Sequence, residues 1–445
     1  MPGPDPTAHL LIVIPVVILA CQSGALLLQR LGQPPVIGEI AVGIMLGPSL
    51  LGRLWPQAQH WLFPESFLPY LSALGTVGLL AFMFLLGLEL DLGAMRGQSR
   101  TALAVSQISI WLPLVLGALL AWGMYASLAP RGTGQPAFVL FIAVSMSITA
   151  FPVLARILID RGLYGTPTGA LAMVCAAVDD VTAWCLLAVV VAVAGSGSPA
   201  AAVVTAVVAA GFVAVLLGAV RPLVSRMARS ADRHADAVVM VLLVSGLCLA
   251  GFATDRIGIH ALFGAFLFGA IVPRGNRKIE RCAGQIRTFV VPVLLPLYFV
   301  STGLKTDVSL LMGSAALWLW AAAILLVAVA GKWGGAALAA RAAGQSWPAA
   351  LTVGALMNCR GLTELVVLNI GLELGVIGPD LFTVLVLMAL VTTCVTSPAV
   401  SWLQRRATGT MALDAAPTGD RLPRSSRAHE PAGPPGTDSW RRDAA

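Results

Sequence analysis

Charged residues are scarce in this sequence: Asp, Glu, Lys and Arg make up 11% of the 445 residues, whereas hydrophobic residues make up 58%. A soluble domain usually carries about a quarter charged residues. The mean hydropathy is +0.87, and long apolar stretches follow one another along the first ~400 residues. A single soluble core is therefore excluded, and lipid is the solvent for most of the chain.

Several motifs are also absent. The seven cysteines are scattered, mostly inside apolar runs, and form no Cys-x-x-Cys pair, which argues against a disulfide framework and a zinc site. No basic stretch is interleaved with aromatic residues, so the net charge of +7 does not indicate nucleic-acid binding. No His-Glu-x-x-His or Gly-x-Ser-x-Gly motif supports an intramembrane enzyme, and no resident cofactor is expected.

Apolar runs of about 17–25 residues predict an all-α polytopic membrane protein with thirteen spans. The transmembrane domain is expected at 1–406, and a tail rich in Pro, Gly, Ser, Arg and Asp, 407–445, is expected to be disordered. The predicted spans are 9–30, 35–51, 68–88, 101–128, 137–159, 167–194, 199–220, 236–254, 257–273, 286–303, 308–340, 348–371 and 378–404.

The positive residues support this number of spans. With thirteen spans, 22 of the 28 Lys and Arg residues lie in the tail or in loops on one side, and only four, Arg53, Arg131, Arg256 and Lys305, lie on the other. Because basic loops stay in the cytoplasm, we expect the N-terminus outside and the C-terminus in the cytoplasm. The odd number also allows two six-span halves of opposite orientation joined by a linking helix, which is the pattern of an inverted repeat.

Five ionisable residues lie at membrane depth, where each costs at least a few kcal/mol and is a functional candidate by default. Asp179 and Asp180 lie near the middle of the sixth span, Lys332 in the eleventh, and Arg360 and Glu364 in the twelfth. Arg360 and Glu364 are spaced i, i+4 and can pair on one helix face.

The Asp179–Asp180 doublet has a specific chemistry. Adjacent helical residues point about 100° apart, so one carboxylate can meet a partner helix while the other faces a water-filled cleft. Two like charges so close in a partly desolvated site do not both ionise easily, and a nearby lysine would hold one as an anion. The other could then trade a proton for a metal cation. The alternative is an Asp–Lys pair that only ties two helices together.

Helix breakers occur at depth in two spans. Pro152 follows Ser147 and Thr149 in the fifth span, and Gly361 lies in the twelfth. Discontinuous helices expose backbone N–H and C=O groups that form ion sites. Ser147 and Thr149 could lend oxygens to a cation or satisfy the broken backbone; the alternative is an ordinary proline kink.

Three further acids lie at span ends. For Glu39, Glu89 and Asp91 we expect solvated or capping roles rather than transport.

Five ordered motifs together resemble the second monovalent cation:proton antiporter family of the sodium/hydrogen exchanger superfamily, which includes plant cation/H⁺ exchangers and bacterial Kef-type systems. The resemblance covers nearly all of the membrane portion. The motifs are GQPPVIGEIAVGIMLGP at 32–48, FMFLLGLELD at 82–91, SITAFPVLAR at 147–156, LYFVSTGLKTD at 297–307 and NCRGLTELVVLNIG at 358–371.

The resemblance implies a core bundle, about 101–194 and 308–404, built around two crossing broken helices and moving like an elevator against a dimerisation panel formed by the remaining spans. It places the ion-carrying aspartate, which would bind the monovalent cation, at Asp180. It places the preceding family position at Asp179, and the core lysine that pairs with this site at Lys332 or, as a second candidate, Lys305. It also implies a homodimer.

Two departures from the family pattern affect the expected function. The tail is too short for the nucleotide-binding domain of Kef-type relatives, so no such regulation is expected. The Asp-Asp doublet resembles sodium/proton exchangers, whereas the flanking motifs resemble the potassium-handling plant group, so both Na⁺ and K⁺ stay open. The expected function is alternating-access exchange of Na⁺ or K⁺ for H⁺ across the cell membrane. The alternatives are a cation channel or uniporter and a membrane-embedded sensor.

Overall fold

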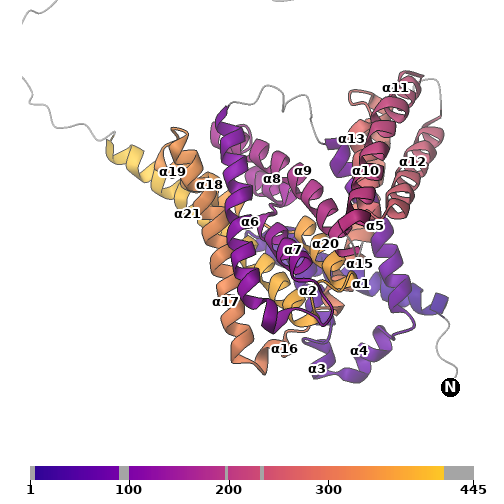
Figure 1. Cartoon of the computed structure of the whole chain (residues 1–445), viewed down its shortest axis with the longest axis horizontal. Helices are drawn as coiled ribbons and strands as arrows, with labels where there is room; N and C mark the ends of the chain where they lie inside the picture. The colour runs from indigo at the N-terminus through magenta and orange to yellow at the C-terminus, as the bar shows by residue number, and fades with distance from the viewer. Residues whose placement is uncertain (1–5, 90–99, 196–198, 231–234, 415–445) are drawn as a thin grey trace, which may run out of the picture.

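The structure is a computed structural model that describes residues 6–89, 100–195, 199–230 and 235–414. The described residues form helices joined by short loops (Figure 1). The first half contains α1 (Pro6–Arg30), α2 (Pro35–Leu46), α3 (Leu51–Leu54), α4 (Pro56–Leu62), α5 (Leu68–Glu89), α6 (Arg100–Leu128), α7 (Gln135–Ser147), α8 (Phe151–Asp160) and α9 (Pro167–Gly195).

The second half contains three π-helical turns, named η2, η4 and η5, each of which continues one α-helix into the next. Its elements are α10 (Pro199–Val215), η2 (Leu216–Val220), α11 (Arg221–Ser230), α12 (Asp236–Ile257), α13 (Ala261–Ile271), α14 (Arg277–Phe289), η4 (Val290–Leu294), α15 (Leu295–Leu304), α16 (Ser309–Met312), α17 (Ala315–Val329), η5 (Ala330–Gly334), α18 (Gly335–Ala342), α19 (Trp347–Met357), α20 (Leu362–Glu373) and α21 (Pro379–Asp414).

The structure fits the expected number of about thirteen spans. Among the described residues, eleven helices are long and apolar enough to cross a membrane, and the bent pair α19 and α20 makes a twelfth. The short apolar helix α13 occupies the place of the remaining expected span, 257–273. At the C-terminal end, α21 continues to Asp414, past residue 407 where the tail was expected to begin, and residues 415–445 lie outside the described part.

Local sequence signals set several helix ends. Pro35 occupies the first turn of α2, where its missing N–H would have had no partner. The side chains of Asn276 and Ser346 accept hydrogen bonds from backbone N–H groups of the first turns of α14 and α19. Gly258 ends α12 in the left-handed conformation, with a φ of 90°.

The helices pack as two groups. In one, α6 contacts α7, α9, α17 and α18, and α19 contacts α9, α18 and α21; in the other, α5 contacts α13 and α15, α13 contacts α12, and α2 contacts α1 and α15. Close approach within the second group needs glycine: a Cβ on Gly43 would lie 2.6 Å from the carbonyl oxygen of Phe299. The functional candidates from α7, α9, η5 and α20 lie inside the first group.

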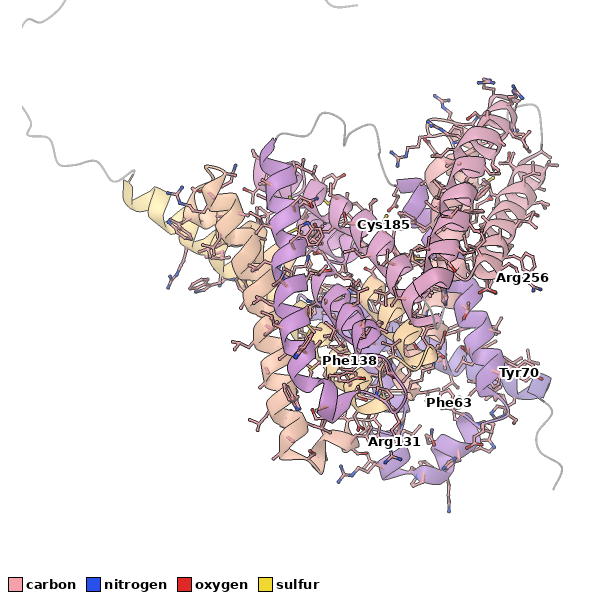
Figure 2. All side chains as sticks on the ribbon, in the orientation of Figure 1. Phe63, Tyr70, Arg131, Phe138, Cys185 and Arg256 are labelled. Carbon is pink, nitrogen blue, oxygen red and sulfur yellow. The ribbon has the colours of Figure 1, made fainter. Side chains whose placement is uncertain are left out.

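The outer surface is largely apolar (Figure 2). Leu119 and Trp122 of α6 and Leu319 and Leu326 of α17 are each more than two-thirds exposed. Figure 2 also shows Arg131 at the lower end of the bundle, while the basic helix α11 lies at the upper end. An apolar belt between helix ends that carry the charged residues fits a protein surrounded by lipid.

Candidate functional site

Two broken helices cross at the centre of the first group. α7 ends at Ser147 and α8 begins at Phe151, while α19 ends at Met357 and α20 begins at Leu362. The backbone N–H of Ala150 in the first break donates to the carbonyl of Cys359 in the second, with an N–O distance of 3.0 Å. A backbone hydrogen bond therefore joins the two breaks and satisfies one buried polar group of each, as buried backbone groups require.

The predicted helix-break residues lie at this crossing, but Pro152 is not where the chain leaves the helix. The break spans 148–150, and Pro152 follows it in the first turn of α8, where a proline costs no hydrogen bond. Gly361 precedes α20 in extended backbone, and a Cβ there would lie 2.6 Å from Cγ2 of Val153. Gly361 thus allows the two breaks to approach closely.

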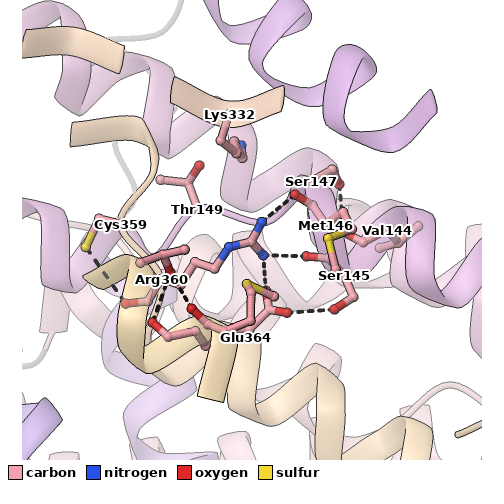
Figure 3. A network of polar contacts seen from close by, with 12 residues as sticks. Val144, Ser145, Met146, Ser147, Thr149, Lys332, Cys359, Arg360 and Glu364 are labelled. Carbon is pink, nitrogen blue, oxygen red and sulfur yellow. Dashed lines mark hydrogen bonds and ion pairs between the residues drawn. The ribbon is translucent and has the colours of Figure 1, made fainter. Parts of the chain in front are cut away.

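Arg360 and Glu364 form the i, i+4 pair that their spacing predicts, and both side chains are fully buried. Figure 3 shows the pair facing the end of α7. The Arg360 guanidinium donates to Glu364 at 2.9 Å and to the carbonyls of Ser145 at 2.8 Å and Met146 at 2.7 Å. The Ser145 hydroxyl donates to Glu364 at 2.6 Å. A cation at the carbonyl end of α7 offsets the negative end of its dipole.

Asp179 is held by donors from three other elements. Lys332 of η5 approaches it at 2.7 Å, and the hydroxyls of Ser106 and Ser109 of α6 donate to it at 2.8 and 3.2 Å. Thr149, in the first break, donates to the same carboxylate at 3.0 Å. Asp179 and Lys332 are both fully buried. The acceptor sites of this carboxylate are thus occupied by protein donors.

Asp180, the next residue, is bound far less completely. It is 3% exposed, and its Oδ1 has no hydrogen-bond partner within the part of the chain that the structure describes. The helix that carries it, α9, packs against α8, the second half of the first broken helix. Asn358, next to the second break, is also buried, with both side-chain amide atoms unpartnered among the described residues. Buried polar atoms without protein partners are rare, and each requires a physical explanation.

The structure distinguishes between the two candidate lysines. Lys332 contacts Asp179, whereas Lys305 contacts Asn369 at 3.1 Å and Glu373 at 3.4 Å. Ser147 also lies apart, because its hydroxyl donates to the carbonyl of Val144 in its own helix. Of the four residues predicted to bind the ion, Asp179, Asp180 and Thr149 come together, and Ser147 satisfies the end of α7.

Of the three acids at span ends, Glu89 forms an ion pair with Arg287 at the surface, and Asp91 lies outside the described residues. The expectation for Glu39 is wrong: it is only 8% exposed, because α2 packs among its neighbours with Glu39 facing inward. No group of three or more His, Cys, Asp or Glu residues that could hold a metal occurs in the described ranges.

Ser106 and Ser109 were not predicted from the sequence. Their i, i+3 spacing places two hydroxyls on one face of an otherwise apolar helix, which is a weak signal for a buried polar partner. Asn358 begins one of the five motifs, but no role was predicted for it, although an amide at membrane depth requires a partner.

Comparison with known proteins gives consistent matches. A family model described as "Sodium/hydrogen exchanger, transmembrane" matches residues 16–406. Na(+)/H(+) antiporter NhaS4 of Synechocystis is 42% identical over 378 residues, which cover 84% of this chain and 92% of that protein. Cation/H(+) antiporter 20 of Arabidopsis thaliana is 41% identical over 90% of this chain and 49% of its own length. K(+)/H(+) antiporter 1 of Saccharomyces cerevisiae is 31% identical over 86% of this chain and 45% of its own length.

The chain thus spans about half the length of the plant and yeast relatives that it matches. Among solved structures, the sodium proton antiporter MjNhaP1 from Methanocaldococcus jannaschii superposes with a TM-score of 0.61, covering 91% of this chain and 99% of that one. At 16% identity, this likeness shows the shared fold.

Proposed function

Because the chain belongs to the sodium/hydrogen exchanger family, we propose that it exchanges a monovalent cation, Na⁺ or K⁺, for H⁺ across the membrane. The observation that carries the proposal is the difference between two adjacent carboxylates. Asp179 is saturated by Lys332 and three hydroxyls, whereas Asp180 keeps an unpartnered oxygen beside the helix crossing, among the residues that the structure describes.

Asp180 is the site at which cation and proton compete. A bare carboxylate in a low-dielectric bundle is costly, and either a bound cation or a bound proton removes its net charge. The neutralised site can then become accessible from the opposite side of the membrane. The amide of Asn358 and the hydroxyl of Thr149 supply neutral oxygens near the crossing, and such oxygens are ligands that alkali cations accept.

The first helix group, which contains the crossing, moves in this proposal as a core against the second group, which forms the panel at which two copies meet. Alternating access of this elevator type keeps the ion site inside the core while the interface between the groups slides. The distribution of basic loops supports an orientation with the C-terminus in the cytoplasm, and the proposed location is the cell membrane.

The test is proton flux in proteoliposomes that carry an imposed pH gradient, followed by separate pulses of Na⁺ and K⁺. Wild-type protein should dissipate the gradient when the transported cation is added, and Asp180→Asn should not. Cation movement without proton movement would establish a channel or uniporter instead, and movement of neither ion would favour a membrane-embedded sensor.

A further inference from the structure

A cavity of about 240 Å³ lies between the two helix groups. Pro35 and Glu39 of α2 and Phe299 of α15 line it from the second group, and Pro152 of α8 and Leu362 of α20 line it from the first. This volume accommodates a cation together with several water molecules. The cavity thus lies at the interface that slides in the proposed mechanism.

Glu39 is an unusual residue for this lining. Its side chain is more than nine-tenths buried, and its carboxylate has no hydrogen-bond or ion-pair partner among the residues that the structure describes. Its neighbours around the cavity include the apolar side chains of Phe82, Leu295 and Phe299. A carboxylate in such surroundings is costly unless water or a cation solvates it from the cavity.

The cavity also reaches water. Arg156 lines it and has a half-exposed side chain. Arg156 bonds Asp160 at 3.0 Å, four residues along α8, so its charge is already balanced. Glu39 is therefore the acidic residue of the cavity lining, and no basic residue in the described part of the chain forms an ion pair with it.

The inner end of the cavity adjoins the ion site. Pro152, a lining residue, lies in the first turn of α8, and α8 packs against α9, the helix that carries Asp180. Leu362 is the first residue of α20, so the first turns of both inner half-helices border the cavity. The cavity thus borders the helix crossing beside which Asp180 lies.

We propose that Glu39 is a second cation-binding residue, which captures the hydrated monovalent cation in this cavity before it reaches Asp180. The inference rests on the proposed exchange function and adds an access site on one face of the membrane. That face is the one that carries the loops with Arg30 and Arg161, which the distribution of basic residues assigns to the cytoplasm.

The transport test compares Glu39→Gln with Glu65→Gln in proteoliposomes. Glu65 is an exposed acid in the loop before α5, so its substitution makes the same chemical change away from the cavity. Because a carboxylate in a cavity concentrates cations locally, Glu39→Gln should raise the apparent KM for the cation on the cavity face about tenfold. The KM on the opposite face and the maximal rate should stay within about twofold, and Glu39→Asp should restore most of the affinity.

An unchanged KM in Glu39→Gln would overturn the proposal. An equal loss on both faces would overturn it too, because that result would assign Glu39 a purely structural role.

A binding measurement separates this proposal from the exchange function itself. Purified Asp180→Asn protein should retain weak binding of radioactive sodium or rubidium. The additional change Glu39→Gln should abolish this residual binding, whereas Glu65→Gln should leave it intact. Absence of binding in Asp180→Asn, or persistence of binding in the Asp180→Asn, Glu39→Gln protein, would refute the Glu39 site even if wild-type exchange were demonstrated. If binding follows the expected pattern but no cation–proton exchange is measured, only the proposed transport function is refuted.

Discussion

Lys332 and Asp179 form an ion pair of 2.7 Å in which both side chains are fully buried. Burying two charges is costly, and their attraction offsets this cost only when the geometry is good and the remaining acceptor sites are filled. Ser106, Ser109 and Thr149 fill them here. The pair is therefore stable as a unit but intolerant of the loss of one member.

Replacing Lys332 by Gln should destabilise the protein by about 3–5 kcal/mol, because an uncompensated Asp179 charge would remain in the core. Lys305→Gln is the matched control. Lys305 and its partner Glu373 are 33% and 55% exposed, and such a pair contributes at most about 1 kcal/mol. Thermal unfolding of the purified variants measures both effects. Equal stability of the two variants would contradict the assignment of Lys332 as the partner of Asp179.

The double variant Asp179→Asn, Lys332→Gln should recover much of the stability that Lys332→Gln loses, since no unpaired charge remains. The amide that replaces the Asp179 carboxylate keeps an oxygen that can accept hydrogen bonds from the neighbouring hydroxyls. If release of the pair supplies a second proton during transport, exchange by wild type moves net charge, and exchange by the double variant is electroneutral. A potential-sensitive dye in the proteoliposome assay reports the difference. Identical dye responses would show that the Asp179–Lys332 pair does not determine the number of charges moved per exchange.

Asn358→Ala should weaken cation binding without lowering stability. The Asn358 amide has no partner among the described residues, so its removal breaks no hydrogen bond. The substitution also removes the desolvation cost of two buried polar atoms, which is about 1–3 kcal/mol. Asn369→Ala is the contrasting variant, because Nδ2 of Asn369 lies within hydrogen-bonding distance of Tyr298, Thr302 and the Leu365 carbonyl. It should lower the melting temperature. Cation titrations followed by thermal shift would measure both properties, and a destabilised Asn358→Ala would show that Asn358 is structural.

Gly303→Ala should separate α2 from α15 and destabilise the protein by about 1–3 kcal/mol, because a Cβ at Gly303 would overlap the backbone of Gly43 and Ile44. Gly211→Ala in α10 is the control, since a Cβ there meets nothing within 4 Å. It should leave stability unchanged or slightly raised, as alanine favours helix. Comparable melting temperatures for the two variants would contradict the close packing of α2 and α15.

The sequence predicts most of this architecture because lipid imposes a strong pattern on it. Apolar length locates the spans, and the cost of charge at depth singles out Asp179, Asp180, Lys332, Arg360 and Glu364. Arg360 and Glu364 form the ion pair that their i, i+4 spacing predicts, although Arg360 lies in the break before α20 and not within the helix. These features are local or depend on one-dimensional spacing.

What the sequence cannot predict depends on the rotation and packing of distant helices. Lys332 lies in a π-helical turn, which shifts the direction in which the side chain points relative to an ideal helix. The choice between Lys332 and Lys305 therefore had to await the structure. Glu39 was expected at a solvated helix end, but the packing of α2 against its neighbours encloses it. Ser106 and Ser109 gain their role only because α6 contacts α9.

The backbone hydrogen bond from Ala150 to Cys359 joins the two breaks across more than two hundred residues of chain. Arg360 adds a second tie by binding the carbonyls of Ser145 and Met146. A chelating site that is braced in this way keeps its shape while its surroundings change. In the proposed exchange mechanism, the free energy of ion binding would then not be spent on rebuilding the site at each turnover, and the barrier to turnover would be set by the solvation of the interface between the two helix groups.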